Sequence, residues 1–172
     1  MDFEEIYRDY RKRQVGLHMA IMKEFVSAGD YLKSAALLGI LNTNNKVVIE
    51  SQHERDALYD FNIYGNIRDG SSALSEYIEK YPPENLEDVE LLSAMNRSSV
   101  QLYEVAEHKE DGFIILNDPS HKTESIKLID IGMSEHLNPN ILLFTRLIHL
   151  KEFSMTSGLA LVFSKNHSNQ IV

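Results

Sequence analysis

Three polar residues in the C-terminal part of the chain carry the side chains best suited to chemistry. Arg146 interrupts the most apolar stretch, Ile141 to Phe163, and a guanidinium within an apolar strand is costly unless a carboxylate or several carbonyls satisfy it. We expect Asp130, in the preceding apolar run, to be its partner. His149 lies three residues after Arg146. Together these residues predict a structural ion pair, with an anion or small-ligand site as the alternative.

The same stretch contains some of the residues that a site with a hydroxyl nucleophile needs. Thr156 and Ser157 precede Gly158, and His149 lies upstream on what should be the neighbouring strand. The chain lacks a G-x-S-x-G elbow and the βαβ framework that displays one. We therefore interpret the stretch as a turn or bulge, with Gly158 supplying an unusual backbone angle, and we predict no catalytic residue.

Metal and cofactor chemistry have weak support. Glu50 and His53 have the Glu-x-x-His spacing of di-iron helices, but such sites need a second pair of this kind and two further carboxylates, and the sequence has no second pair. Cysteine is absent, and the glycines form no phosphate-binding motif. We expect no metal, no cofactor and, on balance, no enzymatic activity.

Composition and charge narrow the class of protein. The 172 residues are 43% apolar and 25% charged, which is an ordinary globular mixture. The net charge of −9 repels phosphate backbones, so we expect no nucleic-acid partner. The acidic N-terminus does not resemble a secretory signal, and no run of eighteen apolar residues could cross a membrane. We expect a soluble, cytoplasmic protein that does not bind membranes.

The first part of the chain has helical periodicity. An apolar stripe predicts a long first helix, which Ser27 to Gly29 should end, and Asp30 should cap the second. The prolines at positions 82 and 83 should end the fourth helix. The five helices are expected over 3–25, 30–41, 46–61, 72–81 and 85–95. The stretch KVVI, at the start of the third, could alternatively be a strand.

After Arg97 the apolar residues alternate, which is typical of strands. We expect about five antiparallel strands, over 100–108, 112–118, 124–131 and two within 141–163. A hairpin turn is expected at 111–112, a polar loop at 118–124 and a type II turn at Pro139. Because both faces of 141–150 are mostly apolar, one face should line a small barrel and the other should pack on the helices or on a second subunit.

The fold class expected is α+β, with a bundle of about five short helices followed by a small, antiparallel, barrel-like sheet. The helical region should cover residues 1–97 and the β module residues 98–172. No stretch rich in Gly, Pro or Ser separates them, so we expect the two to pack together as one compact unit.

Two resemblances support this layout. The stretch AGDYLKSAALLGIL resembles half of a tetratricopeptide unit, with Gly29, Tyr31 and Ala35 in suitable positions, and implies a helical hairpin. The run from Glu87 to Phe163, with GFIILND, SIKLIDI, LNPNILLFTRLI and FSMTSGLALVF in order, resembles a family of uncharacterised bacterial proteins. In that family a helical part precedes a small all-β module. Related modules often have Pro-Gly where this chain has Pro139-Asn140. The resemblance implies the layout and brings no known activity.

Two functions from different classes remain open on the sequence alone. The first, which we favour, is a protein-interaction or regulatory module that binds a protein partner or itself, because doubly apolar strands and helices rich in Tyr and Phe offer contact surface. The alternative is an enzyme or small-ligand binder, with a pocket between helices and sheet around Arg146, Asp130 and His149.

Overall fold

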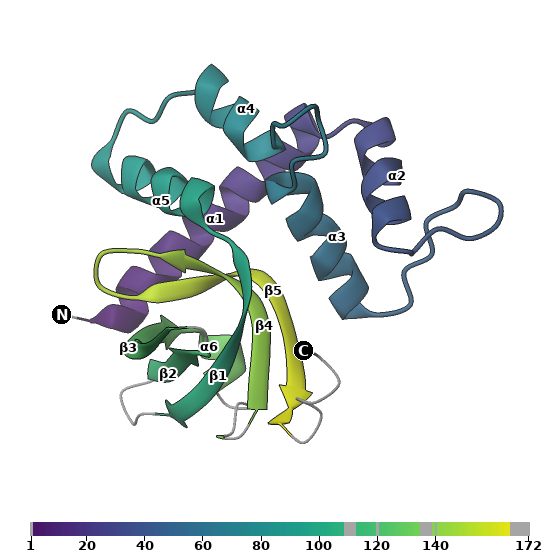
Figure 1. Ribbon diagram of the computed structural model, residues 1–172. Helices are drawn as coiled ribbons and strands as arrows, with labels where there is room; N and C mark the ends of the chain where they lie inside the picture. The colour runs from purple at the N-terminus through teal and green to yellow at the C-terminus, as the bar shows by residue number, and fades with distance from the viewer. Residues whose placement is uncertain (1, 109–112, 120, 135–138, 140, 166–172) are drawn as a thin grey trace. The chain divides into compact units, whose positions relative to one another are not determined.

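The computed structural model describes residues 2–108, 113–119, 121–134, 139 and 141–165 (Figure 1). Its contacts divide the chain into two compact units, Met1–Asn96 and Arg97–Val172. That the two pack together as one body stays a prediction. No helix among the described residues is both long and apolar enough to cross a membrane.

Five helices form the first unit, as the sequence predicts. They are α1 (Phe3–Phe25), α2 (Ala28–Leu37), α3 (Gln52–Tyr64), α4 (Ala73–Lys80) and α5 (Leu86–Arg97). Contacts join α3 to α1, α2 and α4, and also join α1 to α4. Each of the five helices carries fully buried side chains, among them Ile21, Ala35, Leu58, Leu74 and Leu91. The helical hairpin implied by the tetratricopeptide resemblance corresponds to α2 and α3, which contact each other.

Serine caps decide where three of the helices begin. Ser27 does not merely end the first helix but starts α2: its hydroxyl accepts from the backbone of Asp30, whose carboxylate accepts in return from the backbone of Ser27. The prediction that Asp30 is the N-cap is therefore wrong by one turn. Ser51 and Ser72 make the same reciprocal arrangement at α3 and α4, and each satisfies backbone N–H groups that have no partner within the helix.

The third helix begins six residues later than predicted. Residues 46–51 are not helical, and Val47 instead forms an isolated antiparallel bridge with Leu41. The stretch KVVI contains β-branched side chains, which favour extended backbone. Ser51 then caps α3, so Glu50 precedes the helix and cannot share a helix face with His53. The prediction that Glu50 lies on the third helix is therefore wrong.

Arg68, in the connection before α4, forms hydrogen bonds with three helices, α1, α2 and α4. Its guanidinium donates hydrogen bonds to the carboxylates of Asp30 at 3.0 Å and Glu76 at 3.4 Å, and to the backbone carbonyl of Phe25. Asp30 keeps a pKa well below its ordinary value, chiefly because of the hydrogen bond from Arg68, with Ser27 adding to it. This network fixes the end of α1 and the start of α2.

Five strands form a closed ring in the second unit (Figure 1). They are β1 (Val100–His108), β2 (Phe113–Asp118), β3 (His121–Ile129), β4 (Ile141–His149) and β5 (Ser154–Ser164), in the order β1-β2-β3-β5-β4 with β4 returning to β1. All pairs are antiparallel except β3 with β5, which join in parallel at Leu128 and Ser154. The predicted α+β class is confirmed, but this narrow seam makes the sheet a ring rather than a true barrel.

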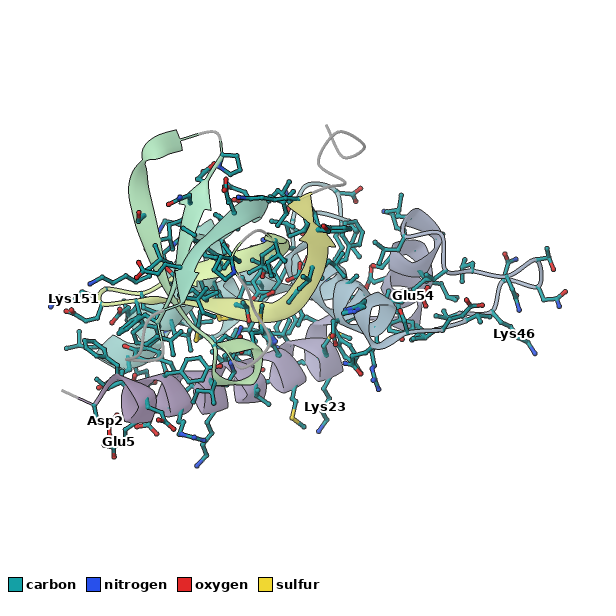
Figure 2. The ribbon with its side chains drawn as sticks, turned by 90° about the horizontal axis from the view of Figure 1, so that it is seen from below. Asp2, Glu5, Lys23, Lys46, Glu54 and Lys151 are labelled. Carbon is teal, nitrogen blue, oxygen red and sulfur yellow. The ribbon has the colours of Figure 1, made fainter. Side chains whose placement is uncertain are left out.

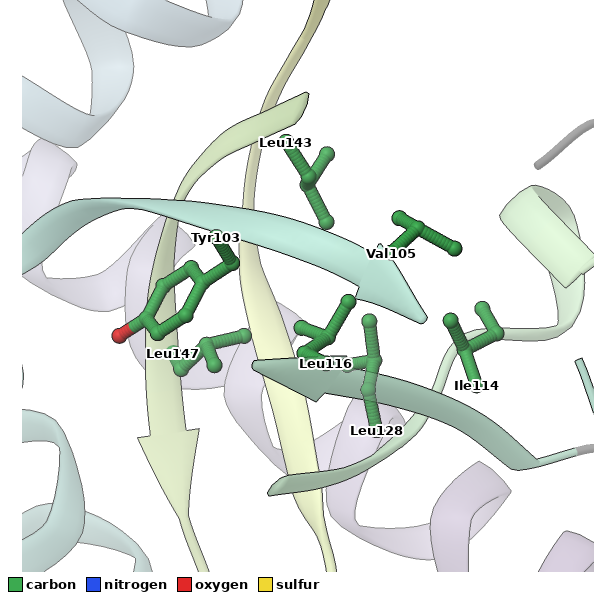
Figure 3. Close-up of a cluster of buried hydrophobic side chains, with 7 residues drawn as sticks. All are labelled: Tyr103, Val105, Ile114, Leu116, Leu128, Leu143 and Leu147. Carbon is green, nitrogen blue, oxygen red and sulfur yellow. The ribbon is translucent and has the colours of Figure 1, made fainter. Parts of the chain in front are cut away.

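The ring encloses a small apolar core. Figure 3 shows seven buried side chains that converge inside it: Tyr103, Val105, Ile114, Leu116, Leu128, Leu143 and Leu147. The prediction that one face of 141–150 lines the sheet is confirmed, because the odd positions of β4 contribute Leu143 and Leu147. The even positions Leu142, Arg146 and Ile148 are buried as well. That this second face packs on the helices or on a second subunit stays a prediction.

The connections between strands differ in part from those expected. Gly158 has φ of +111°, and the pairing of β4 with β5 shifts register between Thr145 and Leu147, which confirms the predicted bulge. The predicted loop at 118–124 is wrong in part, because β3 already begins at His121. Ile131, predicted to end a strand, begins the short helix α6 (Ile131–Ser134). The turns predicted at 111–112 and 139–140 fall wholly or partly outside the described residues.

Candidate functional site

Arg146 is held at the start of β1. Its Nη1 donates a hydrogen bond to the backbone carbonyl of Ser98 at 2.8 Å and lies 3.5 Å from the Ser98 hydroxyl. The two strands are in register here, with Val100 opposite Arg146. The side chain is buried, so a carbonyl partner compensates part of the cost of removing the guanidinium from water. Ser98 is a partner that the sequence does not suggest.

Asp130 follows β3 directly and contacts β5. It accepts a hydrogen bond from the Thr156 hydroxyl at 2.8 Å and one from the backbone of Met133, in α6, at 3.3 Å. Asp130 and Thr156 are both buried. The Thr156 hydroxyl, a possible nucleophile on the sequence alone, therefore donates a hydrogen bond to a buried carboxylate. Pairing of Asp130 with Arg146 stays a prediction.

His149 ends β4 and bonds across the hairpin to the first residue of β5. Its Nδ1 lies 2.8 Å from the hydroxyl of Ser154, and the two residues are also paired in the strand register. Burial lowers the pKa of His149, so the imidazole is neutral at pH 7. The Ser154 side chain is itself buried, at 4% exposure. A serine hydroxyl bonded to histidine can act as a nucleophile only where a substrate reaches it, and this burial opposes that role.

A hollow of about 570 Å³ lies in the helical unit, where α1 faces α3. We name it the α1–α3 hollow, and it is lined by Val15, His18, Met19, Ala20, Met22, Lys23 and Tyr59. The lining is mainly apolar and open: Met19 is 69% exposed, Val15 50% and Tyr59 46%. Such large exposures of neighbouring apolar side chains are typical of surfaces that contact another molecule.

His18 makes one wall of the hollow rigid and uncharged. Its Nε2 lies 2.8 Å from the hydroxyl of Tyr64, and the two rings meet edge to face with centroids 5.7 Å apart. Burial, with a smaller contribution from the nearby Arg11, lowers the pKa of His18 to about 4. The imidazole is therefore neutral at pH 7, and this wall presents aromatic surface rather than charge.

Cationic residues continue along the exposed side of α1. Arg8, Lys12, Val15, Met19 and Lys23 are spaced by three or four residues, so they form one stripe, which we name the α1 stripe. Arg8 pairs with Glu4 at 2.6 Å within the helix. Lys23 extends away from α1 into solvent (Figure 2). The stripe therefore has an apolar centre with a cation on each side.

The sequence holds a signal for this surface. The apolar stripe that predicts the first helix contains Tyr10, Leu17 and Ile21, and Val15 and Met19 lie on a different side of the same helix. A helix that buries one side needs a single apolar stripe, so a second one indicates a further contact. The sequence-based prediction of contact surface rests on the apolar strands and on helices rich in Tyr and Phe, and it does not single out this side of α1.

The polar residues and the hollow differ in what they present to the outside. In the portion of the chain that the structure describes, no three His, Asp or Glu side chains gather to hold a metal ion. Arg146, Asp130 and His149 each hydrogen-bond to a different residue of their own unit: Ser98, Thr156 and Ser154. The α1–α3 hollow, by contrast, presents apolar side chains to the outside.

Comparison with known proteins identifies a family. A family model described as "Family of unknown function (DUF7986)" matches residues 1–172. No curated protein and no solved structure matches the chain.

Proposed function

The chain belongs to this family of unknown function over its whole length, and we propose that within it the protein is a non-catalytic interaction module of the cytoplasm. Its contact surface is the α1–α3 hollow. The observation that carries the proposal is the group of half-exposed apolar side chains Val15, Met19 and Tyr59 around one opening.

The chemistry of these side chains suits a protein partner. Methionine is unbranched and polarizable, so Met19 and Met22 can adapt to the shape of an inserted side chain. Tyrosine adds a large contact area at little conformational cost, and aromatic residues are enriched at interfaces. A shallow apolar hollow between two helices is the kind of site in which an amphipathic helix of a partner lays its apolar face.

The alternative, a ligand or enzyme site around Arg146, has less support. An anion that reached Arg146 would compete with the carbonyl of Ser98 for the guanidinium. The neutral His149 would add no positive charge to such a site at pH 7. The contacts of these residues favour a structural role of the polar group over a ligand-binding one.

Site-specific photo-crosslinking tests the proposal. A photoreactive amino acid at position 19 should give a discrete adduct with a partner protein in the cells that produce this chain. The same group at position 46, in the exposed loop before α3, serves as the control. Met19→Asp should remove capture of that partner, because it places a charge where apolar surface is buried on binding. Adducts that are equal at positions 19 and 46, or absent at 19, would argue against the hollow as a contact surface.

A further inference from the structure

We propose that the partner of the α1–α3 hollow is a second copy of this chain, and that the segment which docks there is the start of α5. This inference rests on the proposed function and makes it more specific. It concerns residues 84–89 of one copy and the α1 stripe of another.

The start of α5 presents two exposed apolar side chains with acidic residues beside them. Leu86 is 84% exposed and Val89 44%, and their spacing of three places them on one side of the helix. Glu84 and Glu87 are exposed beside them. The turn is held in shape because the Asn85 side chain accepts a hydrogen bond from the backbone of Asp88 at 2.8 Å. An ordered turn loses little conformational entropy when it docks.

The α1 stripe has the opposite charge and a matching pattern. Val15 and Met19 are apolar and are also separated by one helical turn, with Lys12 before them and Lys23 after them. Leu86 and Val89 would therefore meet apolar surface, while the glutamates beside them would meet lysines. The chain as a whole carries −9, so two copies repel each other except where a local basic surface meets an acidic one. This complementarity selects the pair of surfaces.

The contact has to form between copies rather than within one. In its own chain α5 is joined to another side of α1, because Tyr10 donates to Glu90 at 2.9 Å and Arg13 pairs with Asp88 at 3.1 Å. Val15 and Met19 lie roughly half a turn around the helix from Tyr10. The start of α5 cannot leave its own contacts to reach the far side of the same helix.

Each copy carries one α1 stripe and one α5 start, which limits the assemblies. Two copies can exchange the contact reciprocally about a two-fold axis, which buries both surfaces of both chains. Otherwise each copy binds the next in a head-to-tail series. Both arrangements use the same residue contacts, so the same substitutions weaken either one.

Charge reversal with rescue tests the inference. Lys23→Glu alone and Glu87→Lys alone should each weaken self-association by about tenfold or more, since both place like charges across the contact. An equal mixture of the two variants should restore association. In the mixture, the negative charge at position 23 of one variant faces the positive charge at position 87 of the other. Sedimentation velocity across the micromolar range measures each mixture. Lys46→Glu is the matched control: it makes the same charge change in a loop that lies well apart from Lys23 (Figure 2).

The outcomes separate this inference from the proposed function. Concentration-dependent association that Lys46→Glu leaves unchanged and the mixed variants restore would support it. A purified chain that stays monomeric throughout, or variants that associate as the unaltered chain does, would overturn it. In that case a crosslink from position 19 to a different protein would leave the proposed function standing.

Discussion

Asp130 accepts a hydrogen bond from Thr156 two residues beyond Leu128 and Ser154, the pair at which β3 and β5 join. Thr156→Val keeps the shape of the side chain and removes the donor. Because a buried carboxylate then loses a charge-assisted hydrogen bond, we expect the free energy of unfolding to fall by about 1.5–3 kcal/mol. Urea denaturation followed by circular dichroism measures the change. Ser99→Ala removes an exposed hydroxyl of the same unit and should stay within about 0.5 kcal/mol, so equal effects would contradict the prediction.

Protonation of His18 should destabilise the helical unit in mild acid. Its pKa is lowered from 6.5 to about 4 in the folded protein, so the unfolded chain binds the proton more tightly. The stabilisation is complete above pH 6.5 and is lost as pH falls toward 4, by about 3 kcal/mol over the interval. His18→Gln should remove this slope. Denaturation at several pH values between 4 and 7 measures it, and parallel curves for both proteins would contradict the assignment.

Substitution of Arg68 should lower the free energy of unfolding far more than substitution of an exposed arginine. Arg68→Met leaves the carboxylates of Asp30 and Glu76 without this donor, and Arg68 is largely buried, with a side-chain exposure of 14%. We expect a loss of about 1.5–3 kcal/mol in the free energy of unfolding. Arg8→Met breaks the exposed pair with Glu4 and should cost less than about 1 kcal/mol. Similar losses for the two variants, measured by urea denaturation, would show that the Arg68 network is not a tie between helices.

Substitution by alanine should change the stability in opposite directions at two glycines. Gly158 has φ of +111°, which strains any residue with a Cβ, so Gly158→Ala should destabilise the second unit by about 1–3 kcal/mol. Gly16 lies within α1, and an added Cβ meets no atom within 4 Å. Gly16→Ala should therefore raise the stability of the first unit by about 0.5–1 kcal/mol. Thermal unfolding of the two variants tests both signs.

Strong periodicity makes much of the fold predictable. The bounds of the first helix and of β1 agree with those expected, because a long apolar stripe and a clean alternation each favour a single structure. The predicted start of α3 is wrong because KVVI has no decisive period, although Ser51 with Glu54 forms a capping box that the sequence displays. The parallel seam of β3 with β5 pairs residues distant in sequence, and no local pattern indicates it.

The polar residues are predictable as types but not as contacts. The sequence marks Arg146 as needing a partner, and a backbone carbonyl meets that need at Ser98, where no side-chain pattern could show it. Likewise His149 contacts Ser154 because a hairpin places the last residue of β4 beside the first residue of β5. The α1–α3 hollow depends on the packing of two helices, and only the exposed apolar side of α1 indicates it in the sequence.

The ring has a consequence for the order in which a nascent chain can acquire structure. β1 pairs with β4, which is made much later, and β5 then has to join both β4 and β3. The second unit therefore cannot complete its hydrogen bonding until the last strand has left the ribosome, and its long-range pairings make its folding slow. The helices of the first unit emerge earlier, and even the contact of Tyr10 with Glu90 can form once α5 has been made. Arrested translation just before Ser154 should thus yield a folded helical unit followed by strands whose edges are still open to aggregation.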